Sequence, residues 1–226
     1  MKILFDRYAN PMSPESIRQS IIDFGHSYNE TVSEIIKNSH IELNKKIFFE
    51  NVATLMPNFQ MTRAEPFKGV NYYGGIFHDP KGQIAACWEG VGNKAVKIRS
   101  FLDQQNKKAR ARALVEISRS ARNEVASELW KMFKKLVSLC MGKNTLGLVA
   151  ASKVLFAVLP EAALPIDNAQ WRNVFKTIDY GDIILLMVSE IAEWERIVKI
   201  HLESCDLYNN STLPAVYNVM AMQAKV

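Results

Sequence analysis

Apolar residues that recur every three or four positions are the feature that most constrains the fold of this chain. The longest such run lies between about Lys107 and Cys140. Its apolar positions are Leu114, Ile117, Ala121, Val125, Trp130, Phe133 and Val137. This period places the side chains on one face of an α-helix. The pattern predicts a single helix of roughly 34 residues, about 50 Å long, which Gly142 ends.

The same spacing predicts helices through most of the remaining chain. Ser13 is a candidate N-cap and Pro14 suits a first helical position, so a long amphipathic helix is expected over residues 14–38. Its apolar stripe is Ile17, Ile21, Phe24, Tyr28, Val32 and Ile35, with a possible bend at Gly25. Further helices are expected over residues 43–55 (ended by Pro57), 94–105, 145–159, 168–176, 183–204 and from Leu213 to the C-terminus.

The segment between Phe59 and Gly92 differs in kind, because it is rich in glycine, proline and aromatic residues. Within it, "VNYYGGIFHDPKGQIAACW" contains two short runs of β-branched or aromatic residues around Asp79-Pro80-Lys81-Gly82. Those four residues are typical of a turn. The sequence therefore predicts a β-hairpin from Val70 to Trp88 with its turn at residues 79–82.

Together these patterns predict a mainly α, compact multi-helix domain with one small β-hairpin element near residues 70–88. With 226 residues the chain can bury a substantial core, and we expect a single domain over residues 1–226. Its expected parts are N-terminal helices (1–57), a Gly/aromatic β element (58–92), and a basic long helix with a C-terminal helical bundle (93–226).

Several functional classes are disfavoured by what the sequence lacks. Three widely separated cysteines favour a reducing compartment, so we expect a cytoplasmic protein. The most apolar run, "LGLVAASKVLFAVLP", is interrupted by Lys153 and falls short of the roughly 20 residues that cross a bilayer, so no membrane partner is expected. The histidines are isolated and no C-x-x-C pair is present, so no metal site is expected. The sequence has neither a phosphate loop nor a nucleophile elbow, so no cofactor is expected. A non-enzymatic protein is the first expectation.

Positive charge is concentrated in one segment of the chain. Residues 93–143 hold thirteen Lys and Arg against four acidic residues, a local charge of +9, whereas the whole chain carries +5 and the remainder therefore −4. A local basic surface is what a polyanionic partner requires. The alternative is a solvated helix face whose cations pair with acidic residues elsewhere in the fold.

The leading hypothesis is an intracellular nucleic-acid-binding protein that uses the basic long helix for phosphate contacts. In "NKKARARA" the interspersed alanines favour helix while the basic groups can reach phosphates. The predicted phosphate-binding residues are Lys94, Lys97, Arg99, Lys107, Lys108, Arg110, Arg112, Arg119 and Arg122.

Residues 87–98, "CWEGVGNKAVKI", resemble the hairpin of helix-hairpin-helix DNA-binding motifs. In that family a Gly-hydrophobic-Gly turn points backbone N–H groups at a phosphate, and the following helix favours the negative charge. The resemblance implies a turn at Gly90-Val91-Gly92 followed by a phosphate-binding helix. A tight strand-to-helix turn that uses glycines for positive φ explains the same residues.

Residues 156–171, "FAVLPEAALPIDNAQW", are similar to the region of helix-hairpin-helix DNA glycosylases that carries the catalytic aspartate. The resemblance implies Asp167 as a weak catalytic candidate in a DNA-processing enzyme. Asp167 also stands three residues before Gln170, the spacing of a capping box at the start of a helix. The cap by itself is a sufficient reason for an aspartate at this position.

A further alternative is a protein–protein interaction or assembly module. The N-terminal amphipathic helix would pack its stripe against a partner helix, which allows a homo-oligomer through helix 14–38. Salt dependence separates these hypotheses, because phosphate binding weakens steeply as salt rises and apolar helix packing does not.

Overall fold

A computed structural model describes residues 2–24, 26–39, 41–63, 65–73, 75–105, 110–143, 145–206 and 212–224, without the side chains of residues 26–29, 110 and 111. The helices are α1 (Pro14–Phe24), α2 (His26–Ser39), α3 (Lys45–Asn58), α4 (Gln83–Gln105), α5 (Arg110–Glu116), α6 (Arg119–Cys140), α7 (Leu148–Val158), α8 (Tyr180–Val198) and α9 (Leu213–Gln223). Two strands, β1 (Asn71–Tyr73) and β2 (Ile76–His78), and the short helices η1 (Met61–Arg63), η2 (Gln170–Phe175) and η3 (Leu202–Cys205) complete the described elements. The predicted mainly α fold with a small β-hairpin is confirmed.

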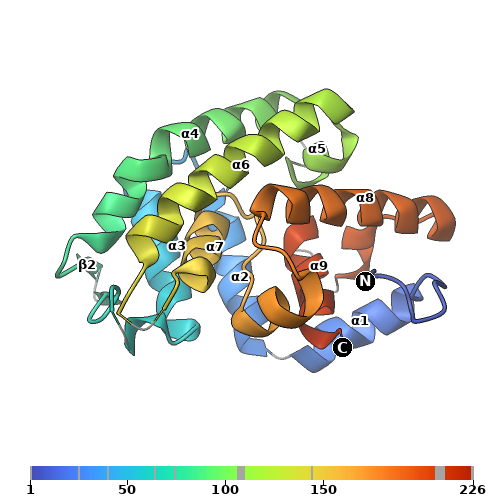
Figure 1. Cartoon of the computed structure of the whole chain (residues 1–226), viewed down its shortest axis with the longest axis horizontal. Helices are drawn as coiled ribbons and strands as arrows, with labels where there is room; N and C mark the ends of the chain where they lie inside the picture. The colour runs from blue at the N-terminus through green and yellow to red at the C-terminus, as the bar shows by residue number, and fades with distance from the viewer. Residues whose placement is uncertain are drawn as a thin grey trace.

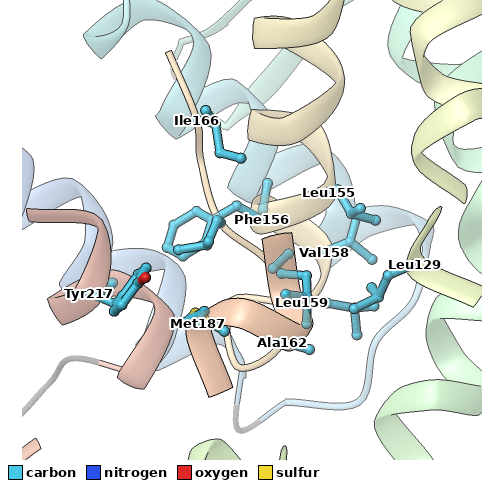
Figure 2. Close-up of a cluster of buried hydrophobic side chains, with 14 of the residues drawn as sticks. Leu129, Leu155, Phe156, Val158, Leu159, Ala162, Ile166, Met187 and Tyr217 are labelled. Atoms are coloured by element: carbon cyan, nitrogen blue, oxygen red, sulfur yellow. The ribbon is translucent and has the colours of Figure 1, made fainter. Parts of the chain in front are cut away.

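Helix α7 lies at the centre of the fold. It packs against α3 and α6, and α6 also contacts α4 and α8. Figure 1 shows α4 and α6 side by side along one edge of the molecule, with α5 near their shared end. Side chains from α6, α7, α8, α9 and the segment after α7 meet in one apolar cluster, in which Figure 2 labels Leu129, Phe156, Leu159, Met187 and Tyr217.

The irregular segment of residues 159–166 is buried along its whole length. Buried backbone polar groups need partners, so such a segment is stable only when side chains supply them. The Tyr180 hydroxyl accepts from the backbone N–H of Leu164 at 2.6 Å and donates to the carbonyl of the same residue at 2.9 Å. The Thr212 hydroxyl donates to the Pro160 carbonyl at 2.6 Å. These contacts fix the path of the chain from α7 to Asp167.

The prediction of one helix from Lys107 to Cys140 is wrong. Residues 106–109 lie outside the described residues, and the remainder forms two helices, α5 and α6, separated by Ile117 and Ser118. Ser118 begins α6 by accepting the backbone N–H of Ala121 at 3.3 Å. The Arg122 guanidinium donates to the Leu114 carbonyl near the end of α5 at 3.1 Å and to the Ile117 carbonyl just after it at 3.2 Å. A serine cap and an arginine that binds the preceding helix end therefore override the continuous apolar stripe.

The predicted hairpin exists, but its turn and its end were misplaced. The strands pair antiparallel with Tyr73 opposite Ile76, so the connection is residues 74–75, and Gly75 has a φ of 78°. Asp79 instead caps α4, because its carboxylate accepts the backbone N–H groups of Gln83 and of residues 84 and 85 at 2.8–3.0 Å. Residues 83–88, expected to form the second strand, are helical.

The N-terminal apolar stripe is buried inside the chain itself. Ile17 and Ile21 of α1 are buried, and α1 packs against α9. Val32 and Ile35 of α2 are buried, and α2 packs against α3. Phe24 is half-buried, and the side chains at 25–29 lie outside the described residues. The stripe is therefore already covered in this structure, and we do not carry forward an assembly that uses it.

The C-terminal half contains helices where the sequence predicts them, but the helices begin and end at other residues than predicted. Helix α8 begins at Tyr180, where the Asp179 carboxylate accepts the backbone N–H of Asp182 at 3.1 Å, and it ends at Val198 before Lys199, which has a φ of 64°. The segment expected to be an α-helix over residues 168–176 becomes a π-helix from Gln170. None of the described helices has the length and apolar character needed to cross a membrane.

Candidate nucleic-acid interface

A groove of about 280 Å³ runs between the outer faces of α4 and α6. Apolar side chains form its floor and charged side chains form its rim. We call it the α4–α6 groove; α4 contributes Lys94, Lys97, Ile98 and Phe101, and α6 contributes Ala121, Glu124, Val125 and Glu128. Two predicted phosphate-binding residues, Lys94 and Lys97, are thus exposed on the same wall.

Two further lysines lie on α6 beyond the lining residues, toward the end of that helix. The Lys131 ammonium lies 2.5 Å from the Glu128 carboxylate, whose other oxygen is 3.2 Å from the Lys94 ammonium. Lys135 lies beside Gly90, where an added Cβ would come within 3.4 Å of its Cγ. The spacing of 131 and 135 by one helical turn was a signal in the sequence that these residues share a face. We call Lys94, Lys97, Lys131 and Lys135 the groove lysines.

Glu128 neutralises part of this charge. The hydrogen bond from Lys131, followed by the hydrogen bond and charge of Lys94, lowers the pKa of Glu128 below its usual value. The carboxylate is therefore charged at neutral pH and pairs with Lys94 across the groove and with Lys131 on its own helix. Lys97 and Lys135 are exposed and form no ion pair with another described residue.

The Gly90-Val91-Gly92 segment does not form the turn that its resemblance to helix-hairpin-helix motifs implies. All three residues lie inside α4, so their backbone N–H groups belong to the helix. Gly90 allows α4 to pack closely on α6, since an added Cβ would stand 3.1 Å from the Leu139 side chain. The N-terminus of α4 is occupied by the Asp79 carboxylate, which leaves no site for a phosphate there.

Arg112, one of the predicted phosphate-binding residues, is buried and binds acidic groups. One of its guanidinium nitrogens lies 2.6 Å from a Glu195 oxygen and 2.9 Å from a Glu203 oxygen, and another lies 2.8 Å from the second Glu195 oxygen. Burial lowers the pKa of Arg112, but the hydrogen bonds and charges of Glu195 and Glu203 outweigh it and raise the pKa above its usual value. Its donors face α8 and η3, away from solvent.

Two more of the predicted arginines have structural partners. Arg99 is buried, with a guanidinium nitrogen 3.6 Å from the buried Glu161 carboxylate. Arg122 binds the end of α5, and burial lowers its pKa. Arg119 is exposed at the start of α6, the side chain of Arg110 is not described, and Lys107 and Lys108 lie outside the described residues.

A cluster of possible metal ligands surrounds Arg112. One ligand atom each from Glu195, His201 and Glu203 lies within 4.8 Å of the others. Arg112 already binds both carboxylates, so a divalent cation would have to displace a buried guanidinium. The arrangement is that of a charge-compensated ion-pair cluster, and we assign no metal to it.

Asp167 forms the capping box that its spacing predicts. Its Oδ1 accepts the backbone N–H of Ala169 at 3.0 Å and of Gln170 at 3.2 Å, and the Gln170 side-chain oxygen accepts the Asp167 N–H at 2.9 Å. Nearby Lys153, which the sequence analysis treated only as an interruption of an apolar run, is 5% exposed. Its ammonium lies 4.0 Å from the centre of the Phe59 ring.

Burial lowers the pKa of Lys153 to about 8, and the charge of Asp167 opposes this effect only partly. A desolvated lysine can serve as a base or a nucleophile where a substrate can reach it. Here the side chain is almost completely enclosed. The Asp167 carboxylate meanwhile holds the start of the next helix, a structural role that accounts for this residue.

A second cleft, of about 510 Å³, lies between the N-terminal segment, α1 and α9. Its lining includes Lys2 and Arg7. Lys2 pairs with Glu193 at 2.5 Å, and the Arg7 guanidinium lies 4.7 Å from the centre of the Tyr8 ring. These cations already have partners, which makes the cleft a poorer polyanion site than the α4–α6 groove.

Comparisons with known proteins find no matching family model, no matching curated protein and no matching solved structure. Among the described residues, the α4–α6 groove combines exposed cations with an accessible concave surface.

Proposed function

We propose that this chain binds nucleic acid and that the groove lysines supply its phosphate contacts. The observation that carries the proposal is that exposed Lys94 and Lys97 line the groove, while exposed Lys131 and Lys135 follow on α6, one paired with the groove residue Glu128 and the other beside Gly90 of α4. Among the described lining residues, Glu124 and Glu128 carry the opposing charge. A row of ammonium groups beside an apolar floor suits a chain that alternates phosphates with sugars and bases.

The proposed phosphate-binding residues differ from those that the sequence predicts. Arg99, Arg112 and Arg122 are left out because their guanidinium groups bind Glu161, Glu195, Glu203 and the end of α5. Arg119 remains available at one end of α6. We place the function in the cytoplasm, which is supported by three buried cysteines present as thiols, Cys87, Cys140 and Cys205.

Reversing the charge of the two unpaired groove lysines should weaken binding and flatten its salt dependence. Two to four phosphate contacts predict a slope of about −2 to −4 for log K against log salt, and Lys97→Glu with Lys135→Glu should reduce that slope by about two. Fluorescence anisotropy of a labelled oligonucleotide at several salt concentrations measures both quantities.

The control is the matched double variant Lys37→Glu with Arg196→Glu, which changes the net charge equally at exposed positions on α2 and α8. It should bind like the parent protein. If both double variants weaken binding to the same extent, only net charge matters and the α4–α6 groove is not the site.

Neutralising Glu128 should have the opposite effect. Glu128→Gln removes one negative charge from the groove and releases Lys94 and Lys131, so we expect affinity to rise about fivefold at low salt. The same titration measures the change, with Glu34→Gln on the exposed face of α2 as the control. A gain cannot arise from damage to the fold, and equal affinity of Glu128→Gln and parent would contradict the assignment.

A further inference from the structure

The β-hairpin lies at the start of α4, the helix that forms one wall of the α4–α6 groove. Strand β2 leads through the Asp79 cap directly into α4, and Figure 1 shows β2 beside the first turns of that helix. Lys97 stands fourteen residues after Gln83, about 21 Å along the helix axis. The hairpin and the groove lysines therefore lie within reach of one extended ligand.

The two faces of the hairpin differ. Directly opposed residues share a face, so Tyr72 and Phe77 point one way while Tyr73 and Ile76 point the other. The first face packs on α3, where the Phe77 ring stacks on Phe49 with centres 4.6 Å apart. On the second face Tyr73 is 84% exposed and Ile76 is 63% exposed.

The hairpin therefore presents Tyr73 from a fixed base. The Phe49–Phe77 stack holds the strands on α3, and the Asp79 cap fixes the exit from β2. An aromatic and an aliphatic side chain, adjacent and largely exposed, are unfavourable in water unless a partner covers them.

Exposed lysines stand in the segments around the hairpin. Lys68 is exposed shortly before β1. Lys143 is exposed in the loop after α6, where Gly142 packs closely on the carbonyl of Glu65. Lys135 is exposed on α6 beside Gly90 of α4. An anionic ligand with flat, apolar parts matches both the charge and the exposed ring.

We propose that the ligand is a single-stranded nucleic acid, with one base stacked on Tyr73 against Ile76 and phosphates several nucleotides further along the strand on the groove lysines. The inference rests on the proposed function and specifies its substrate. Bases in a duplex stack on each other, whereas unpaired bases can stack on an exposed aromatic ring. Tyr73 is thus a determinant of single-strand preference, and the groove lysines supply affinity that is independent of base pairing.

The test compares a labelled single-stranded oligonucleotide of roughly a dozen nucleotides with its duplex. Parent protein should bind the single strand about tenfold more tightly than the duplex. Tyr73→Ala should lose about tenfold in affinity for the single strand while its affinity for the duplex and its salt slope stay unchanged. Tyr73→Phe keeps the ring and should bind like the parent, as should Tyr8→Ala, which removes another exposed tyrosine.

The possible failures are distinguishable. Suppose that binding is salt-dependent and that the Lys97 and Lys135 reversals weaken it. If Tyr73→Ala then leaves binding unchanged, or if the parent prefers the duplex, only the single-strand inference is overturned. If the parent protein does not bind, or if its binding does not respond to those reversals, the proposed function is overturned as well.

Two further measurements cover the other possible occupants of the hairpin face. Sedimentation with phosphatidylserine-containing vesicles tests a membrane surface, and sedimentation velocity of the protein alone tests a second copy of the chain. The inference is overturned if Tyr73→Ala abolishes vesicle binding or dissociates a dimer while leaving oligonucleotide binding intact. It is supported if neither property depends on Tyr73.

Discussion

Replacing Arg112 with methionine is expected to lower the free energy of unfolding by about 3–5 kcal/mol. Methionine fills a similar space but leaves Glu195 and Glu203 without the guanidinium that binds both of them. The Glu195 side chain is only 11% exposed, so water replaces the lost partner poorly. The variant also loses the link between α5 and α8. Urea denaturation of parent and variant at neutral pH measures the loss.

The dependence of unfolding free energy on pH should change at acidic pH in the same variant. Burial raises the pKa of Glu195, but hydrogen bonds from Arg112 and the Leu202 N–H, with the charge of Arg112, bring it below its usual value of 4.5. A carboxyl group with a lower pKa in the folded state adds stability above the unfolded pKa, and this stability is lost as pH falls through the folded pKa. The parent should therefore lose stability below about pH 4.5, and the Arg112→Met variant should lack this contribution.

Two comparisons isolate the ion-pair cluster. Arg119→Met, at an exposed position, should change stability by less than about 0.5 kcal/mol. Combining Arg112→Met with Glu195→Leu and Glu203→Gln should recover most of the loss, because no unpaired charge remains. If Arg112→Met instead folds like the parent and loses nucleic-acid binding, Arg112 is the phosphate contact that the sequence suggested.

Local signals in the sequence identified the features that depend on neighbouring residues. The spacing of Asp167 and Gln170 predicted a reciprocal cap, and both hydrogen bonds are present. The stripe that includes Ile17 and Ile35 predicted buried faces, which is confirmed for Ile17, Ile21, Val32 and Ile35, whereas Phe24 is half-buried. Such features depend on contacts within one or two helical turns, so periodicity and capping rules capture them.

The sequence could not show which cations remain at the surface. The +9 of residues 93–143 counted Arg99 and Arg112 as available, but their acidic partners, Glu161 and Glu195, lie more than sixty residues away in the chain. Only tertiary packing brings these groups together. The break before α6 has a local cause, the Ser118 cap and the Arg122 guanidinium bound near the end of α5, but the apolar stripe runs through it without interruption and so predicted one continuous helix.

Replacing Lys153 with methionine is expected to stabilise the protein at pH 7 by on the order of 3 kcal/mol. The lysine is 5% exposed, and its pKa of about 8 in the folded protein compares with the usual lysine pKa of 10.5. This difference means that the fold disfavours the charged ammonium despite the Phe59 ring and Asp167. Methionine fills the site without a charge. Urea denaturation measures the gain, with exposed Lys37→Met as a control that should change little.

The stability gained by Lys153→Met should change with pH in a definite direction. Below pH 8 both folded and unfolded chains carry the Lys153 proton, and the folded state bears the full cost of the buried charge. Between pH 8 and 10.5 the folded state releases the proton while the unfolded state keeps it, so the contribution of Lys153 to stability rises with pH. The difference between parent and Lys153→Met should therefore narrow across this interval and vanish above it.

A variant that is less stable than the parent at pH 7 would show that the ammonium is held favourably by Phe59 and Asp167, and the low pKa would then be wrong. If the variant is more stable, the chain retains a lysine that works against its own folding. Residues of that kind are expected where function requires them. Comparing oligonucleotide binding by Lys153→Met and the parent at pH 7 and 9 then tests such a role directly, because the Lys153 ammonium loses its proton between these two values only in the parent.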